Sequence, residues 1–331
     1  MKFEEEEECR TLSMTRTRNN RVSWLIHDYL EDNPHVLFAE QLKSMEIPAA
    51  EGVSLFRMFF INYCKELDEE NGQEDSVTDY LEASLRVLDP RIYASDPYYI
   101  NIRIPHAKEG HWELYTESYQ PFEAFVCDDI RLDDDFRETP QVGFFTEPFS
   151  FPAVKESDHE WMSVKPNEVE TMRSAIAAAE GEVLAFGLGL GYFAYMASLK
   201  DAVSSVTIVE RDKAVIDLFQ EYILPQFSTK RKIRILHADA FDVAKDLAMY
   251  GTFRFAFVDL WHDVSDGLPL YLRMKKLEKL SSSTQFSYWV EESLLSALRW
   301  KVFNAVLAHA DSYDQIIREL SDSNLKRFAT R

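Results

Sequence analysis

The C-terminal half of this sequence predicts an α/β fold built on a doubly wound, mostly parallel sheet. Five apolar runs alternate there with amphipathic segments, and continuous apolar runs between helices are typical of strands buried in a parallel sheet. A glycine-rich turn directly follows the first run, at residues 187–191. Ahead of this half, the sequence predicts an N-terminal helical unit and a small antiparallel β segment.

The predicted elements of the C-terminal half alternate regularly along the chain. A first helix is expected from Pro166 to Gly181, because proline suits a first helical turn and glycine suits a helix end. The strands are expected at residues 182–187, 205–210, 232–239, 253–260 and 285–292, and the helices between them at 192–199, 213–223, 243–250 and 270–279. The tail at 293–325 is also expected to be helical.

Three consecutive segments are expected along the whole chain. Residues 1–95 form the helical unit, since apolar side chains recur at helical spacing in 53–67. Residues 96–155 form the β-rich segment, with short runs of aromatic and β-branched residues, and residues 156–331 form the sheet domain with its helical tail. The five glutamates at 4–8 are expected to form a solvated, frayed terminus.

Composition excludes several classes of partner. The 331 residues include 36 Lys and Arg against 57 Asp and Glu, a net charge of −21, so phosphate backbones and anionic bilayers are repelled and neither nucleic acid nor a membrane is expected as a partner. The three cysteines form no C-x-x-C pair, which indicates neither a disulfide framework nor a metal site. With no signal-peptide pattern at the N-terminus, we expect a cytoplasmic protein.

The glycine turn and one acid carry the functional prediction. Gly187, Gly189 and Gly191 lie between a predicted strand and a predicted helix, where a missing Cβ permits a sharp turn and close approach of a ligand. Glu210 ends the second strand, nineteen residues after Gly191, where a carboxylate can accept hydrogen bonds from a ribose diol. Together these features predict a Rossmann-like domain that binds a nucleoside cofactor.

Two further acids follow strands of the same predicted sheet. Asp239 comes after the third strand and Asp259 after the fourth. Because the carboxyl ends of parallel strands open on one crevice, both acids should converge there with Glu210 and the glycine turn. An acid in this position is also a common helix cap, which is the alternative interpretation for Asp239.

With these residues, the stretch from Trp161 to Glu292 resembles the class I S-adenosylmethionine-dependent methyltransferases, and within them the spermidine-synthase-like branch. The resemblance implies S-adenosylmethionine as the cofactor. It implies that the glycine turn lies against the methionine part, that Glu210 with Arg211 holds the ribose, and that Asp239 with Ala240 lies beside the adenine. Asp259 matches a strand-end aspartate of that branch and is expected among the cofactor-binding residues. It also implies a small-molecule acceptor, whose identity the sequence does not show.

The sequence departs from that branch at several positions. Ala185 and Phe186 replace the acid that usually begins the glycine motif, Leu190 stands where aminopropyltransferases have aspartate, and five residues, Asp259 to Asp263, replace their D-x-x-D. The final strand pair of the fold is not evident after residue 292. An aminopropyltransferase and a non-catalytic nucleoside-binding module therefore stay open. So does an NAD-dependent dehydrogenase, because residues 189–194 match G-x-G-x-x-A.

Methyl transfer demands few reactive side chains. The cofactor supplies the reactive carbon, and the protein contributes alignment and, where the acceptor must lose a proton, a base. Candidates are Asp259 as orienter or base, His262 for proton transfer, and Asp263 as its partner. Trp161 and Asn167 could cover the ligand or belong to the core. The oligomeric state is left open, with a homodimer as one option.

Overall fold

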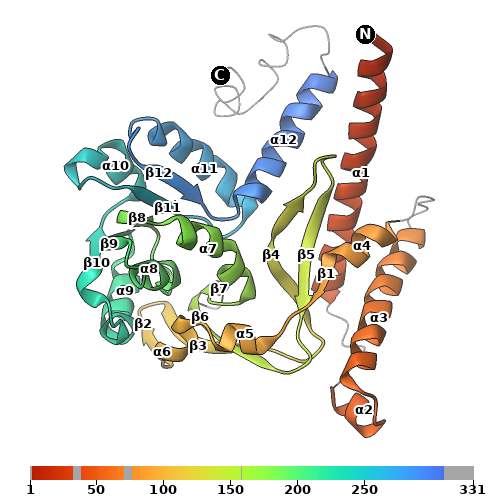
Figure 1. Cartoon of the computed structure of the whole chain (residues 1–331), viewed down its shortest axis with the longest axis horizontal. Coiled ribbons are helices and arrows are strands. Elements are labelled where there is room, and N and C mark those ends of the chain that lie inside the picture. The colour runs from red at the N-terminus through yellow and green to blue at the C-terminus, as the bar shows by residue number, and fades with distance from the viewer. Residues whose placement is uncertain (1, 33–38, 71–76, 158, 309–331) are drawn as a thin grey trace. The chain divides into compact units, whose positions relative to one another are not determined.

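The computed structural model describes residues 2–32, 39–70, 77–157 and 159–308, which form two compact units (Figure 1). Unit 1 comprises Met1–Tyr93 with Ser118–Ser150, and unit 2 comprises Ala94–Glu117 with Phe151–Arg331. This partition differs from the three consecutive segments expected from the sequence, because the middle of the β-rich stretch pairs with a strand of the first segment.

In its described residues, unit 1 combines five helices of different lengths with a three-stranded sheet. Its elements are α1 (Lys2–Asp32), α2 (Ala39–Ser44), α3 (Ala49–Glu70), α4 (Thr78–Ser84), β1 (Leu85–Val87), α5 (Pro90–Ala94), β4 (Ala124–Leu132) and β5 (Glu138–Phe144). In the sheet, β5 lies between β1, its parallel neighbour, and β4, its antiparallel neighbour. The first segment is therefore not purely helical. Strand β1 was not predicted because three residues are too few to show a periodicity and because its partner strand lies more than fifty residues away in the sequence.

The acidic N-terminus is part of a helix. Helix α1 begins at Lys2, so the expectation of a frayed terminus at residues 4–8 is wrong. Glutamate has high helix propensity, and its charge is favourable near a helix N-terminus. The longest helix of unit 1 therefore includes the acidic run.

The core of unit 1 lies between its two long helices and its sheet. Tyr29 of α1 meets Phe60 of α3 edge to face, with ring centroids 4.8 Å apart. Phe56 of α3 lies 4.3 Å from the ring of Phe144 on β5. All four side chains are at most 2% exposed. The apolar face predicted at residues 53–67 is confirmed as the surface that α3 buries.

Unit 2 begins with a small sheet and continues into a large parallel one. After α6 (Pro97–Asn101), the small sheet has the order β2 (Ala107–Glu109), β3 (Trp112–Tyr119), β6 (Phe149–Glu156) and β7 (His159–Ser163). The pairs β2–β3 and β6–β7 are antiparallel. The predicted antiparallel β segment is thus present, but its strands are shared between two sheets.

The large sheet is parallel throughout and has the order β10-β9-β8-β11-β12. Its strands are β8 (Gly181–Phe186), β9 (Val203–Glu210), β10 (Ile233–His237), β11 (Phe255–Val258) and β12 (Gln285–Tyr288). All five predicted strands are present, so the predicted α/β, Rossmann-like fold class is confirmed. The winding direction reverses between β8 and β11, and the carboxyl ends of these two strands flank the crevice where such sheets bind ligands.

The helices of unit 2 follow the predicted alternation, with shifted boundaries. They are α7 (Pro166–Ala178), α8 (Tyr192–Ser198), α9 (Lys213–Leu218), η1 (Phe219–Ile223), η2 (Leu224–Gln226), η3 (Lys230–Lys232), α10 (Ala240–Lys245), η4 (Leu247–Met249), α11 (Val264–Glu278) and α12 (Glu291–Ala308). Right-handed crossovers place α8 and α9 on one face of the sheet and α10 and α11 on the other. Helix α11 begins six residues before the predicted position, and β12 ends four residues earlier than predicted.

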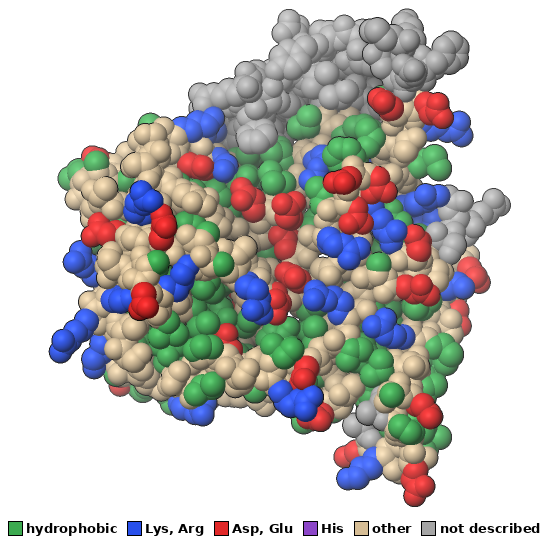
Figure 2. Space-filling model, in the orientation of Figure 1, with side chains coloured by type: hydrophobic (Ala, Val, Ile, Leu, Met, Phe, Trp, Pro, Cys, Tyr) green, Lys and Arg blue, Asp and Glu red, His purple; other side chains and the backbone are tan. Residues whose placement is uncertain are grey.

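The end of the described chain is helical. In the part of the chain up to residue 308, α12 follows β12 directly and adds no strand to the sheet. The predicted helical tail is therefore present as far as Ala308, and its remainder, 309–325, lies outside the described residues. Among the helices described, none is both long and apolar enough to cross a bilayer. On the face shown in Figure 2, acidic and basic side chains are interspersed.

Candidate functional site

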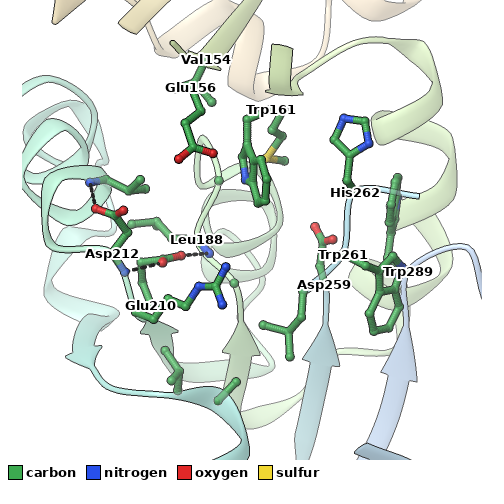
Figure 3. Close-up of a pocket in the computed structure, with 18 of the residues that line it drawn as sticks. Val154, Glu156, Trp161, Leu188, Glu210, Asp212, Asp259, Trp261, His262 and Trp289 are labelled. Carbon is green, nitrogen blue, oxygen red and sulfur yellow. Dashed lines mark hydrogen bonds between the residues drawn. The ribbon is translucent and has the colours of Figure 1, made fainter. Parts of the chain in front are cut away.

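A cavity of about 470 Å³ lies in unit 2 at the carboxyl ends of the parallel strands (Figure 3). Its floor comes from the residues that follow β8, β9, β10 and β11, and its walls come from β3, β6, β7 and α7. The volume is in the range of small-molecule sites. The predicted convergence of strand-end residues at one crevice is therefore seen in this structure for Gly187, Glu210, Asp239 and Asp259.

The glycine turn is shaped by the protein atoms that press against it. Gly187 and Gly189 have φ angles of +102° and +49°, which favour glycine. A Cβ on Gly187 would collide with the backbone oxygen of Asp259, and one on Gly189 with the sulfur of Met162. The turn therefore needs glycine for its backbone conformation, in agreement with the sharp turn expected from the sequence, and also for packing against protein atoms, which the sequence did not indicate.

Glu210 links two adjacent turns through its carboxylate. Its Oε2 accepts a hydrogen bond from the backbone N–H of Leu188 at 3.2 Å, and its Oε1 accepts one from the N–H of Asp212 at 2.8 Å (Figure 3). A carboxylate has about four lone-pair sites, so roughly two are left for a ligand. Glu210 lines the cavity with its neighbour Arg211.

Asp239 acts as a helix cap and also lines the cavity. Its Oδ1 accepts hydrogen bonds from the N–H groups of Phe241 at 2.8 Å and Asp242 at 3.2 Å, so it caps α10. Asp239 and Ala240 both belong to the cavity lining. The cap explains why α10 begins at Ala240, before the predicted start at residue 243.

Asp259 lies at the base of the cavity, pointing into it (Figure 3). Burial raises the pKa of its carboxyl group to about 7, and repulsion from the Glu210 carboxylate adds to the rise. No hydrogen bond to the Asp259 side chain exists within the described part of the chain. A carboxyl group with a pKa near neutrality can exchange a proton with a bound ligand.

Glu168 is a cavity residue that the sequence did not indicate. It lies in the first turn of α7, is 7% exposed, and lines the cavity. Burial raises the pKa of its carboxyl group well above the usual range. Asp259 adds to this rise and Lys165 opposes it. An acid in a first helical turn is ordinary on dipole grounds, so a single sequence contains no signal that separates it from a site residue.

The two remaining candidates differ in position. His262 lines the cavity, with its side chain 54% exposed and Nε2 3.3 Å from the carbonyl oxygen of Glu160. Asp263 is not among the lining residues. Its carboxylate accepts the N–H groups of Ser265 and Asp266 as the N-cap of α11, and the Ser265 hydroxyl bond holds the pKa of Asp263 below its usual range. The capping box explains both the early start of α11 and the distance of Asp263 from the cavity.

Aromatic side chains form much of the upper cavity wall. Trp161 is 39% exposed at the mouth and meets Trp112 edge to face, with ring centroids 5.8 Å apart. The Nε1 of Trp261 and the Oδ1 of Asn167 are buried and have no hydrogen-bond partner in the described part of the molecule. The sequence left open whether Trp161 and Asn167 cover the ligand or belong to the core. Both residues line the cavity.

Two tyrosine hydroxyls make hydrogen bonds around the start of α8. The hydroxyl of Tyr98 donates to the carbonyl of Leu190 at 2.6 Å, and the hydroxyl of Tyr192 donates to Asp96 at 3.0 Å. Tyr98 and Tyr192 are buried. Gly191, the N-cap of α8, is not among the residues that line the cavity.

Within the described ranges of the chain, no group of three or more His, Cys, Asp or Glu side chains is arranged to hold a metal ion.

No family model matches this chain, and no curated protein matches its sequence. Solved structures give partial matches. Spermidine synthase from Thermotoga maritima is 14% identical, with a TM-score of 0.30, over 45% of this chain and 55% of that one. TrmN from Thermus thermophilus is 18% identical, with a TM-score of 0.30, over 47% of this chain and 51% of that one. The match thus spans about half the length of each protein, and the strand order and pairing described above define the fold.

Proposed function

We propose that this protein is an S-adenosylmethionine-dependent methyltransferase that acts on a small-molecule acceptor. The observation that carries the proposal is the Glu210 carboxylate, tied to the N–H of Leu188 in the glycine turn and facing a cavity of about 470 Å³. It lies where doubly wound sheets bind nucleosides. Its free lone pairs suit the two hydroxyls of a ribose.

The lining residues fit the cofactor in kind. Glu210 with Arg211 would hold the ribose, Asp239 with Ala240 would lie beside the adenine, and the turn at 187–189 would lie along the methionine part. When bound, S-adenosylmethionine supplies an electrophilic methyl group. The chain's own task is then to align the acceptor, to exclude water and to take up a proton, for which Asp259 is the best-placed group.

The position of the α8 N-terminus relative to the cavity argues against the dehydrogenase alternative. A dinucleotide rests its pyrophosphate on the helix N-terminus that follows the glycine turn. Here Gly191, the N-cap of that helix, is not a cavity residue, and the cavity extends along residues 187–189 instead. This supports a mononucleoside ligand.

Titration calorimetry with S-adenosylhomocysteine tests the proposal, with NAD and methylthioadenosine as parallel ligands. We expect micromolar binding of S-adenosylhomocysteine alone. Preference for methylthioadenosine would support the aminopropyltransferase, and binding of NAD the dehydrogenase. Binding without turnover across an acceptor screen would support a non-catalytic module, and the absence of all binding would overturn the proposal.

A pair of variants assigns the binding to this cavity. Glu210→Gln should weaken S-adenosylhomocysteine binding by about tenfold or more, because hydrogen bonds to a charged group are the strong ones. Glu180→Gln is the matched control, since Glu180 pairs with Arg254 at 2.5 Å and is not among the cavity residues. Equal affinities for the two variants would remove Glu210 from the site.

A further inference from the structure

The cavity is lined by many more acids than bases. Lys165 and Arg211 are its cationic residues, and His262 adds an imidazole. Seven carboxylates face them: Glu156, Glu160, Glu168, Glu210, Asp212, Asp239 and Asp259. The excess of negative charge indicates a preference for cationic ligands only if some of these carboxylates are not already used by the protein.

Five of the seven carboxylates are used. Glu210 and Asp239 accept backbone N–H groups as described above, and Asp212 caps α9 while accepting the indole N–H of Trp112 at 3.1 Å. Glu160 pairs with Lys165 at 2.8 Å, and Glu156 pairs with His111 at 3.2 Å. Each of these interactions neutralises or orients its carboxylate.

Glu168 and Asp259 are the two exceptions. Neither carboxylate has a hydrogen-bond or ion-pair partner among the residues that the structure describes. Glu168 is more than nine-tenths buried and faces the same cavity as Asp259. Burying a polar group without a partner costs free energy, so an unpartnered buried carboxyl in a cavity wall points to a ligand that pairs with it.

The surroundings of the two acids disfavour two negative charges. Glu168 faces Asp259 from β11, Glu160 from β7 and Lys165 at the start of its own helix, and Asp259 faces Glu210 from β9. Lys165 is engaged with Glu160. Neighbouring carboxylates in a buried site retain a proton unless a cation replaces it.

The aromatic wall suits the same kind of ligand. Trp161, Trp261 and Trp289 line the cavity around Asp259 (Figure 3). The faces of indole rings attract cations, and their carbon atoms accept an alkyl chain. An alkylammonium group therefore matches both the acids and the walls.

We infer that Glu168 and Asp259 together bind the protonated nitrogen of the methyl acceptor, which is an aliphatic amine. The inference rests on the proposed function and adds the acceptor class and Glu168, a residue that no sequence motif marks. Binding of the ammonium group displaces the proton that the two carboxyls otherwise retain.

The transfer step balances with these groups. The bound ammonium group gives one proton to Asp259, which leaves a lone pair on nitrogen. That lone pair forms the new N–C bond as the S–C bond of the cofactor breaks and its electron pair stays on sulfur. The N-methylated acceptor leaves as an ammonium ion, and Asp259 returns its proton to solvent.

The test is the binding of n-butylamine to the protein saturated with S-adenosylhomocysteine, with 1-butanol as the uncharged probe of similar shape. We expect the amine to bind and the alcohol to bind at least about tenfold more weakly, since a charged hydrogen bond is lost. Amine affinity should rise from pH 6 to pH 8 as the carboxyls lose their proton. The amine itself stays protonated, because alkylamines resemble lysine with a pKa of about 10.4.

Two variants separate Glu168 from a general charge effect. Glu168→Gln should weaken butylamine binding by about tenfold or more and leave S-adenosylhomocysteine binding within about twofold. Glu156→Gln is the control, because it removes a carboxylate from the same cavity that is already paired with His111. Equal loss in both variants, or equal affinity for amine and alcohol, would overturn the inference.

The wild-type protein gives a measurement that does not depend on the folding of a variant. Calorimetric titration with butylamine near pH 7, repeated in buffers of different ionisation enthalpy, should show release of a proton on binding. Binding without proton release would contradict the inference. Absence of S-adenosylhomocysteine binding would instead count against the proposed function, so the two failures are distinguishable.

Discussion

Gly189 brings the small sheet into contact with the glycine turn, because the sulfur of Met162 on β7 lies against its Cα. Gly189→Ala should lower the unfolding free energy by about 1–2 kcal/mol, because alanine disfavours the left-handed conformation, and by about 1–3 kcal/mol more, because the added Cβ overpacks against Met162. Gly110→Ala is the control, with a φ of +59° and open space beside it, and should show only the first loss. Denaturant unfolding measures the unfolding free energy of both variants. Adding Met162→Ala should recover the second loss, and no recovery would contradict the packing argument.

At the same scale, the sequence predicted the positions of some cavity residues and not of others. Glu210 and Asp259 follow apolar strands directly, and strand ends of a parallel sheet converge whatever their loops do. Glu168 could not be predicted, because its cavity exists only once α7 packs against the carboxyl end of β11. Asp263 resembles Asp259 in the sequence, yet the residues after it form a helix that uses its carboxylate as a cap.

At the scale of elements, Asp239 and Asp263, which follow strands, set the starts of α10 and α11 as their N-caps. Asp263→Ala should cost about 1 kcal/mol of unfolding free energy, since the capping box of α11 loses its acceptor. S-adenosylhomocysteine affinity should stay within about twofold, because Asp263 does not line the cavity. Denaturant unfolding and calorimetry measure the two quantities, and Asp263→Ser should restore stability. A large loss of affinity at unchanged stability would return Asp263 to the site.

Element boundaries were less predictable than element types for a local reason. The helix was expected to begin at residue 270, whereas the capping box at Asp263 and Asp266 sets its start at Val264 and the helix accommodates Pro269. Strand β1 is three residues long and is defined by its pairing with β5. Such a strand depends on tertiary contacts rather than on its own pattern.

At the scale of the whole molecule, the doubly wound parallel sheet was predicted from the sequence and the division into units was not. Alternating strands and helices with right-handed crossovers restrict a parallel sheet to a few orders, and the position of the glycine turn indicates the switch point. The insertion of residues 118–150 into unit 1 depends on pairing between segments distant in sequence. No local periodicity encodes a contact of that kind.

The pH dependence of stability is a property of unit 2 as a whole. The pKa values of Glu168 and Asp259 are raised by folding, so the native state holds more protons than the unfolded state between about pH 4 and pH 7. The stabilisation that proton binding to these two carboxyls gives the native state is complete below their pKa values in the unfolded chain. It is lost as pH rises through their pKa values in the folded protein, so the unfolding free energy should fall over this window. Unfolding in urea followed by tryptophan fluorescence measures this free energy, because five of the six tryptophans belong to unit 2.

The net charge of −21 also makes the unfolding free energy fall as pH rises, through general repulsion. The double variant Glu168→Gln, Asp259→Asn should therefore flatten the dependence in part, whereas Glu156→Gln should not. An unchanged slope in the double variant would show that the two carboxyls are ionised in the folded protein.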